Sequence, residues 1–306
     1  MPVATKDHQE QLTQLQKEMA NFRAIMEHVR SIPSQFTMDN MDLYGETFPL
    51  NGKDGGDHIV FLDFVERYDL DHLAQCANLA GDSSRATRLR DLRNRIGVLV
   101  ADASGHCTTD ALLAAMLHQA FLTGVLYELE TNGHVTAKLF EILNTRFHRS
   151  SAVTKFLTMI YGEITEDGTF RFISAGHPKP MIFSSEFDCF VNIDPSRLTT
   201  TFPVGMFPAE TDVDERLDSE PLVYKKKYTV NEVNLMAPGD ILLLYTDGLE
   251  EHTASGEPFF PGPLEETVRR CKHLSSREIV GSIRQAMIDF APPEDDTSLV
   301  VIKRLG

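Results

Sequence analysis

The segment from Lys155 to Pro178 constrains the fold more than any other part of this sequence. It consists of two apolar runs, rich in β-branched and aromatic residues, on either side of Glu166-Asp167-Gly168. A turn of this composition between two strand-like runs predicts an antiparallel β-hairpin. Other strand-like runs are also joined as hairpins, and the helical stretches come in pairs. We therefore expect an α+β fold, in which helices pack on antiparallel sheets.

The rest of the chain alternates strand-like and helical patterns. Strands are expected near 58–68, 96–102, 241–246 and 297–305, with a second hairpin between 180 and 193. Helices are expected at about 108–127, 134–149, 262–272 and 275–290. A polar excursion of helix and loop at 69–95, an irregular stretch at 194–222 and the long stretch 208–234 before the strand at 241–246 separate some of these elements. No internal repeat or low-complexity tract is present.

Composition limits the functions that the chain can have. The formal net charge of the 306 residues is −16, which argues against nucleic acid and anionic membranes as partners. The four cysteines form no CxxC pair, so neither a disulfide framework nor a zinc cluster is expected. No apolar run reaches the ~20 residues of a membrane span, and the N-terminus lacks the apolar core of a signal peptide. We expect a cytoplasmic protein.

The N-terminal segment predicts a long amphipathic helix that ends near Pro33. Its apolar residues alternate spacings of three and four: Leu12, Leu15, Met19, Phe22, Met26 and Val29. Such a seam packs either on the helix's own domain or on a second chain as a short coiled coil. We divide the chain into this helical segment, residues 1–36, and one larger domain, residues 37–306.

Acidic residues stand at the ends of several expected strands. Asp102 ends an apolar strand and is followed by small residues, and Asp247 ends another and is followed by Gly248. Asp57 follows two glycines and precedes a strand, and Asp295 and Asp296 precede the last strand. Each acid therefore lies at the junction of a buried strand and a turn or loop.

Two explanations fit these acids. Any single Asp beside a glycine is well explained as a turn former or a helix cap. Several carboxylates that converge would repel one another and would be costly to desolvate. A hard divalent cation such as Mg²⁺ or Mn²⁺ removes both difficulties, because it takes oxygen ligands. Two such ions about 3.5–4 Å apart can activate a water for attack on phosphorus.

The ordered set of motifs around these acids resembles the metal-dependent protein phosphatases of type 2C, the PPM family. Within that family, the sequence is similar to the bacterial SpoIIE/RsbU-like branch. The motifs are "GGD" at 55–57, "ADASGH" at 101–106, "ISAGHPKPMIF" at 173–183, "LLLYTDGLEE" at 242–251 and "EDDTSLVVIKR" at 294–304. The resemblance covers roughly residues 45–306. It implies a two-sheet antiparallel β-sandwich flanked by helices, with a two-metal centre at one end.

The resemblance also implies roles for individual residues. The acids that match the family's metal-site and catalytic positions are Asp57, Asp102, Asp247 and Asp295, and Ala103 matches the position that offers a backbone carbonyl to a metal. Asp296, His106 and Gly248 are expected around these ligands, where Asp296 either supports them or helps to hold a third, weaker ion. His106 is interpreted either as a general acid or, preferably, as a residue that holds its turn. His177, in the turn "AGHPKP", is interpreted as structural.

The function implied is hydrolysis of phosphoserine or phosphothreonine on a regulatory protein, by a water activated by two Mn²⁺ or Mg²⁺ ions. In this branch the substrates are regulators of sigma factors, so we expect an anti-sigma-factor antagonist or a similar signalling partner. The N-terminal helix is expected to pair two chains or to receive a signal. The alternative is a catalytically silent scaffold with the same fold. The spacing of Cys271 and Arg277 also fits a thiol phosphatase, but no glycine-rich phosphate loop surrounds Cys271.

Overall fold

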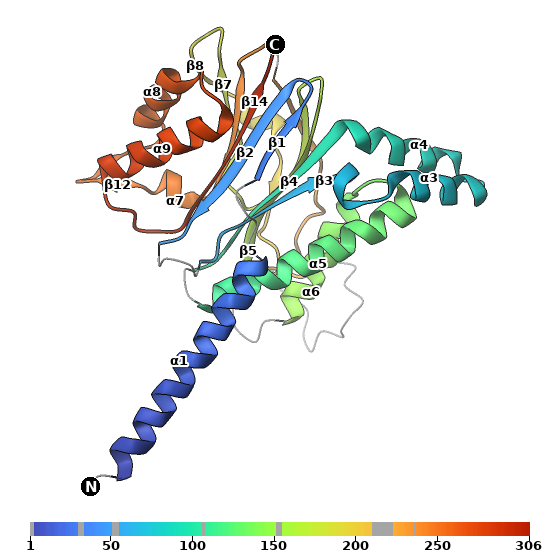
Figure 1. The fold of residues 1–306 in the computed structure, drawn as a ribbon. Coiled ribbons are helices and arrows are strands. Elements are labelled where there is room, and N and C mark those ends of the chain that lie inside the picture. The colour runs from blue at the N-terminus through green and yellow to red at the C-terminus, as the bar shows by residue number, and fades with distance from the viewer. Residues whose placement is uncertain are drawn as a thin grey trace.

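Two β-sheets pack face to face, and helices cover both outer faces (Figure 1). The structure, a computed structural model, describes residues 3–29, 34–50, 55–105, 108–150, 155–209, 223–235 and 237–306. Sheet I has the order β1 (Ser34–Met38), β2 (Met41–Phe48), β14 (Thr297–Arg304), β11 (Ile241–Tyr245), β7 (Met181–Ser184) and β8 (Cys189–Val191). Sheet II has the order β10 (Asn231–Asn234), β6 (Thr169–Ala175), β5 (Leu157–Thr165), β4 (Arg95–Ala103) and β3 (His58–Asp63).

The expected fold class is confirmed, including the hairpin at 155–178. Strands β5 and β6 pair antiparallel, with Ile160 opposite Ser174, around the turn that ends at Gly168. The neighbouring strands of both sheets also pair antiparallel; the short β9 (Thr200–Thr201), which runs parallel to β6, is the exception among the described strands of these sheets. A small separate hairpin joins β12 (Thr253–Ala254) to β13 (Glu257–Pro258). This antiparallel pairing follows from the short turns between strands.

The alternation of side chains along each strand creates three apolar layers. Inner-face residues from both sheets form the central core, for example Val98 of β4 and Leu244 of β11. The outer face of sheet II packs on α5 (Thr108–Asn132) and α6 (Ala137–Ser150), and the outer face of sheet I packs on α8 (Gly262–Cys271) and α9 (Ser276–Phe290). Successive residues of a strand point to opposite faces, so each strand contributes to two layers.

The helices agree with the sequence pattern, with small shifts at their ends. The predicted helix at 108–127 continues to Asn132, and α8 and α9 lie close to the predicted ranges. Helix α9 starts with a capping box, in which Ser275 and Glu278 satisfy each other's backbone N–H groups. Contrary to the expectation that no apolar run reaches that length, α5 alone among the described helices has the length and apolar composition of a membrane span. Its buried side chains pack against sheet II, as a core helix requires.

The N-terminal helix is confirmed as α1 (Val3–Val29), and it projects from the sandwich next to α5 (Figure 1). Leu12 and Leu15 of its apolar seam are 59% and 61% exposed. Pro33 lies outside the described residues. The division at residue 36 stays a prediction, and β1, which pairs with β2, spans that boundary.

The polar excursion at 69–95, expected as helix and loop, consists mainly of helices. After α2 (Phe64–Arg67), α3 (Leu70–Leu79) and α4 (Ser83–Asp91) lie side by side, and the short helix η1 (Leu92–Asn94) leads into β4. Arg85 Nη1 donates to the carbonyl of Glu130 at 2.7 Å, and Arg88 Nε donates to that of Asn132 at 2.7 Å. Two arginines of the Arg-rich stretch therefore cap the last turn of α5.

The stretch at 208–234 is anchored on α6. Lys225 Nζ lies 2.5 Å from Glu141 Oε2, and the backbone N–H of Tyr228 donates to Glu141 Oε1 at 2.7 Å. The Lys225 ammonium also lies 3.8 Å from the centre of the Tyr228 ring. Residues 210–222 lie outside the described part. The short helix η2 (Pro195–Arg197) precedes β9.

Candidate metal centre

Polar side chains continue the inner-face pattern of the strands at one end of the sandwich. In β4, the inner residues Ile96, Val98 and Val100 are followed two positions later by Asp102. The same alternation in the other strands leads to Asp57 before β3, Thr158 at the start of β5, Thr246 after β11, and Ser298 and Asp296 at the start of β14. Because a strand has a period of two, these side chains point into the gap between the sheets where the apolar core ends.

The carboxylates at this end are near enough to change one another's pKa. Burial, followed by the charges of Asp57, Asp247 and Asp295 and a hydrogen bond to Asp57, raises the pKa of Asp102 to about 9. Burial likewise raises the pKa of Asp57 to about 8, against the hydrogen bond from Thr246. The pKa of Asp247 is raised by burial and then by the charges of Glu251 and Asp295. Four acids from four separate chain segments therefore repel one another at one place.

Asp57 is held by a hydrogen-bonded chain that reaches across both sheets. It is only 4% exposed, and its Oδ2 accepts a hydrogen bond of 2.6 Å from Thr246 Oγ1. Thr246 Oγ1 in turn accepts from the backbone N–H of Ser298 at 2.8 Å. This chain fixes Asp57, at the edge of sheet II, against β11 and β14 of sheet I.

Asp296 shapes the turn that precedes Asp57. Its two oxygens accept hydrogen bonds from the backbone N–H groups of Leu50 at 2.7 Å and Gly56 at 2.8 Å. A Cβ at Gly55 would lie 2.5 Å from Asp296 Oδ2, so only glycine leaves room for the carboxylate. The backbone N–H of Asp296 donates to Asp295 Oδ1 at 2.8 Å. With these bonds, Asp296 supports the neighbouring acids rather than facing solvent.

Two other glycines permit close backbone approach beside the acids. A Cβ at Gly56 would lie 2.7 Å from the carbonyl oxygen of Ala103 and 2.5 Å from that of Gly105. A Cβ at Gly248 would lie 2.1 Å from the carbonyl oxygen of Asp296. The small residues that follow or precede the acids in the sequence are therefore needed for the strand ends to meet.

His106, which the resemblance puts near the acids, lies outside the described residues, so its role stays a prediction. The sequence has a further acid close to this motif, Asp110. Asp110, at the start of α5, is fully buried and forms an ion pair with Lys155, so the extra acid has its own counter-charge. Nothing in the sequence around Lys155 marks it as that partner, because the two residues are 45 positions apart. Thr246, in contrast, could be found by extending the alternation of β11 by one residue.

The residues present fit a hard divalent cation. The donors are carboxylate oxygens and the carbonyl of Ala103, which are the ligands that Mg²⁺ and Mn²⁺ prefer. The raised pKa values of Asp57 and Asp102 mean that protons, or another positive charge, must balance the buried acids. As they stand, no three His, Cys, Asp or Glu side chains of the described chain form a group that could hold a metal ion. Among the described residues, the acids therefore influence one another's pKa without forming a preformed ligand group.

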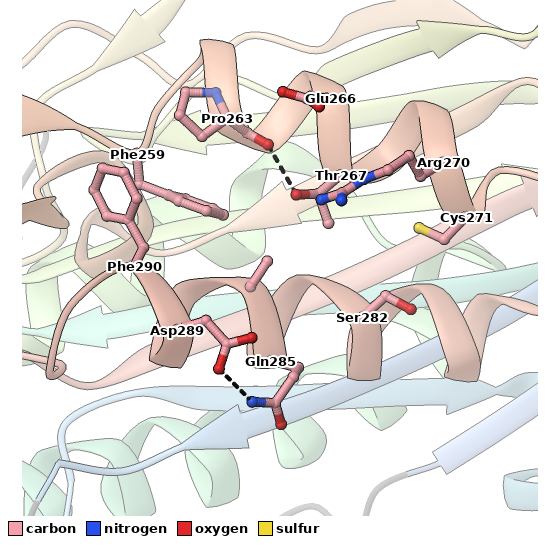
Figure 2. A pocket seen from close by; sticks show the side chains of 11 residues that line it. Phe259, Pro263, Glu266, Thr267, Arg270, Cys271, Ser282, Gln285, Asp289 and Phe290 are labelled. Atoms are coloured by element: carbon pink, nitrogen blue, oxygen red, sulfur yellow. Dashed lines mark hydrogen bonds between the residues drawn. The ribbon is translucent and has the colours of Figure 1, made fainter.

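Cys271 lies in a different part of the molecule, in an open groove of about 640 Å³ between α8 and α9 (Figure 2). Its side chain is 5% exposed, and burial raises the pKa of the thiol, so the thiol is protonated and a poor nucleophile. Cys271 is the last residue of α8, whereas a phosphate-binding loop would have to follow it with free backbone N–H groups. The guanidinium of Arg277 instead lies 5.8 Å from the ring centre of Tyr44. This geometry does not suit a thiol phosphatase.

Comparison with known proteins yields one family and a shared fold. The family model described as "Stage II sporulation protein E (SpoIIE)" matches residues 93–305. No curated protein sequence matches the chain significantly. Among solved structures, the RsbU and RsbW domains of a Mycobacterium tuberculosis protein are 19% identical with a TM-score of 0.55, over 87% of this chain and 60% of that one.

Two further structures have the same fold. The PP2C phosphatase domain of SpoIIE from Bacillus subtilis, with a fragment of its regulatory domain, is 14% identical with a TM-score of 0.57, over 90% of this chain and 65% of that one. RsbX in complex with magnesium is 13% identical with a TM-score of 0.54, over 89% of this chain and 100% of that one. The chain thus spans less than two thirds of the first two structures. At these identities the likeness concerns the fold, which is that of PPM phosphatases.

Proposed function

The chain belongs to the SpoIIE family, and from that premise we propose that it is a Mn²⁺- or Mg²⁺-dependent phosphatase of phosphoserine or phosphothreonine in a regulatory protein. The observation that carries the proposal is the convergence of Asp57, Asp102, Asp247 and Asp295, each of which comes from a different segment of the chain. A cluster of buried acids without a cation is unfavourable, so it is best explained as a binding site for one.

We assign the ions to these four carboxylates and to the carbonyl of Ala103, with Asp296 as a supporting residue or as a ligand of a third ion. When bound, two such ions would supply an activated water and would offset the charge of the phosphoryl oxygens. The chain's own residues orient the ligands: Thr246 holds Asp57, and Asp296 fixes the turn before it. The magnesium in the RsbX structure is in keeping with this choice of metal.

We further propose a regulatory phosphoprotein, such as an anti-sigma-factor antagonist, as the substrate, and the cytoplasm as the compartment. The support for this substrate is the family itself and the similarity to RsbU and RsbX, among structures that share the fold. We also propose that the N-terminal segment, through α1, pairs two chains. The exposed seam of Leu12 and Leu15 on α1 supports pairing, because an apolar stripe of this kind is stabilised by a partner.

A catalytically silent scaffold is the second candidate. The absence of a preformed metal-binding group among the described residues favours it over an enzyme with a rigid site. In that case the domain would bind a signalling partner without turning over a phosphoester. The two candidates differ in whether divalent ions bind to the acidic cluster.

Hydrolysis of p-nitrophenyl phosphate and of a phosphoserine peptide, with and without Mn²⁺, Mg²⁺ and a chelator, tests the proposal. We expect turnover that requires the ion, that the chelator abolishes, and that falls at least a hundredfold in Asp102→Asn and Asp247→Asn, on the order of losses for essential groups. Asp39→Asn, in the exposed turn between β1 and β2, is the matched control. Full turnover in both site variants would disprove the assignment. Failure of millimolar Mn²⁺ to bind in calorimetry would support the scaffold.

A further inference from the structure

The connection from β6 to β7 crosses from sheet II to sheet I at the end of the sandwich that carries the acids. Its backbone is fixed at Gly176, which has φ +66° and donates its N–H to Thr200 Oγ1 at 3.2 Å. A Cβ at Gly176 would lie 2.5 Å from Pro203 Cγ, so the neighbouring chain also confines the turn. The next residue, His177, therefore enters the gap between the sheets from a rigid position.

His177 contacts both sheets. The imidazole is 4% exposed, and its Nδ1 lies 2.9 Å from Thr158 Oγ1 of β5. Thr158 is the residue opposite Asp102 in the β4–β5 pairing, and residues directly opposite in an antiparallel pair share one face of the sheet. The ring also interacts with the backbone of Tyr245, the last residue of β11, two positions before Asp247. His177 thus lies between the neighbours of two of the four acids.

The buried ring has little freedom in how it bonds. Burial lowers the pKa of His177 to about 3, so the imidazole is neutral and has one donor and one acceptor nitrogen. Nδ1 is used by Thr158 of sheet II, and the second polar contact of the ring is with the backbone of Tyr245 of sheet I. The neutral ring therefore links one residue of each sheet.

We propose that His177 is a positioning residue of the metal site, which sets the separation of Asp102 on sheet II and Asp247 on sheet I through Thr158 and the end of β11. The inference rests on the proposed function, because the acids need this separation only if they share cations. His177 acts through its neighbours and touches neither the ions nor the substrate. Groups that orient metal ligands from behind change metal affinity about 10- to 100-fold when they are removed.

The test measures Mn²⁺ affinity by calorimetry, with the metal alone as the probe, in the native chain, His177→Phe and Thr158→Val. Each variant keeps a side chain of similar size and removes one partner of the hydrogen bond between His177 and Thr158. We expect each to bind Mn²⁺ about tenfold more weakly. The double variant should be no weaker than the worse single variant, because both changes break one connection. His177→Asn, which keeps a polar group near the place of Nδ1, should recover most of the affinity.

Turnover of p-nitrophenyl phosphate supplies a second readout. At saturating Mn²⁺, kcat should fall while KM changes less than twofold, since substrate contacts are untouched. His134→Gln, beyond the far end of α5, is the control and should change neither value. If His177→Phe does not fold by circular dichroism, Thr158→Val, with Thr158→Ser as its conservative partner, decides the question alone.

The outcomes separate this inference from the function on which it rests. A native chain that binds no Mn²⁺ overturns both. A native chain that binds and turns over, with folded variants that bind Mn²⁺ within twofold of it, overturns only the role of His177. Losses that add fully in the double variant overturn the connection through Thr158 as well.

Discussion

Replacing Asp102 by Asn should stabilise the metal-free protein while it destroys activity. In the folded chain, burial and the charges of Asp57, Asp247 and Asp295 raise the pKa of Asp102 to about 9. In the unfolded chain the group returns to its ordinary value of 3.8. At pH 7 the folded protein must therefore hold a proton that the unfolded chain releases, and this requirement opposes folding.

The size of the effect follows from the two pKa values. Between pH 3.8 and pH 7, holding the proton costs about 1.4 kcal/mol of folding free energy per pH unit. The largest stabilisation that Asp102→Asn could give at pH 7 is therefore about 4 kcal/mol. Asn has nearly the same shape as Asp and can still donate a hydrogen bond to Asp57. Its polar amide must also be buried, however, and this desolvation reduces the gain in stability. We therefore expect a gain of about 1–3 kcal/mol, or a rise in Tm of about 2–6 °C for a chain of this size.

Thermal unfolding in excess chelator measures this gain. A carboxyl with a raised folded pKa contributes its full stability below the unfolded value of 3.8 and loses it as the pH rises towards 9. The native chain should consequently become more stable from pH 7 to pH 5, and the advantage of Asp102→Asn should shrink over that range. Excess Mn²⁺ should reverse the order at pH 7, because it stabilises only the chain that binds it. A variant with a lower Tm than the native chain at pH 7 without metal would refute the reasoning, as would a gain that persists unchanged at pH 4.

Three other substitutions test separate parts of the structure. Gly56→Ala adds a Cβ 2.5 Å from a backbone oxygen. The variant should have a free energy of unfolding lower by about 2 kcal/mol or more, and it should lose metal-dependent turnover. A variant that is active and as stable as the native chain in urea unfolding would contradict this. Lys155→Met leaves Asp110 buried without its ion pair and should cost about 3 kcal/mol at neutral pH; an unchanged free energy of unfolding in denaturant titration would contradict this. Arg88→Ala removes a cap of α5 and should cost about 1 kcal/mol with kcat unchanged, so a loss of turnover at full folding would place α4 in the active site.

The sequence sufficed for the fold class because antiparallel pairing follows from local rules, whereas the metal-binding role of the acids stays a prediction. Hairpin turns imply antiparallel neighbours, and a period of two determines which face of a strand a residue occupies, so acids at strand ends could be singled out without knowing the sheets. The partner of Asp110 could not be predicted in this way, because Lys155 comes next to Asp110 only once strands β4 and β5 have paired. The bridging place of His177 also depends on the distance between two sheets, which no pattern within one strand encodes.

The irregular stretches were the least predictable for a related reason. The residues at 69–95 carry many charges, yet apolar positions such as Leu70, Ala74 and Leu89 are buried in the layer that covers sheet II, and Arg85 and Arg88 also bond to the end of α5. The segment around Lys225 similarly depends on Glu141, a residue 84 positions earlier. Such contacts join distant parts of the chain, and a sequence read in windows does not contain them.

The last long strand lies in the middle of its sheet, between β2 and β11. During synthesis, β2 leaves the ribosome some 250 residues before the strand that pairs with it along its whole length. Sheet I therefore stays open, with one edge of β2 unpaired, until residues 297–304 emerge. Asp295 and Asp296 arrive together with that strand, so a nascent or truncated chain carries only part of the acidic cluster. Long-range closure of this kind slows folding and prolongs the exposure of bare strand edges, which is when chaperones are most needed.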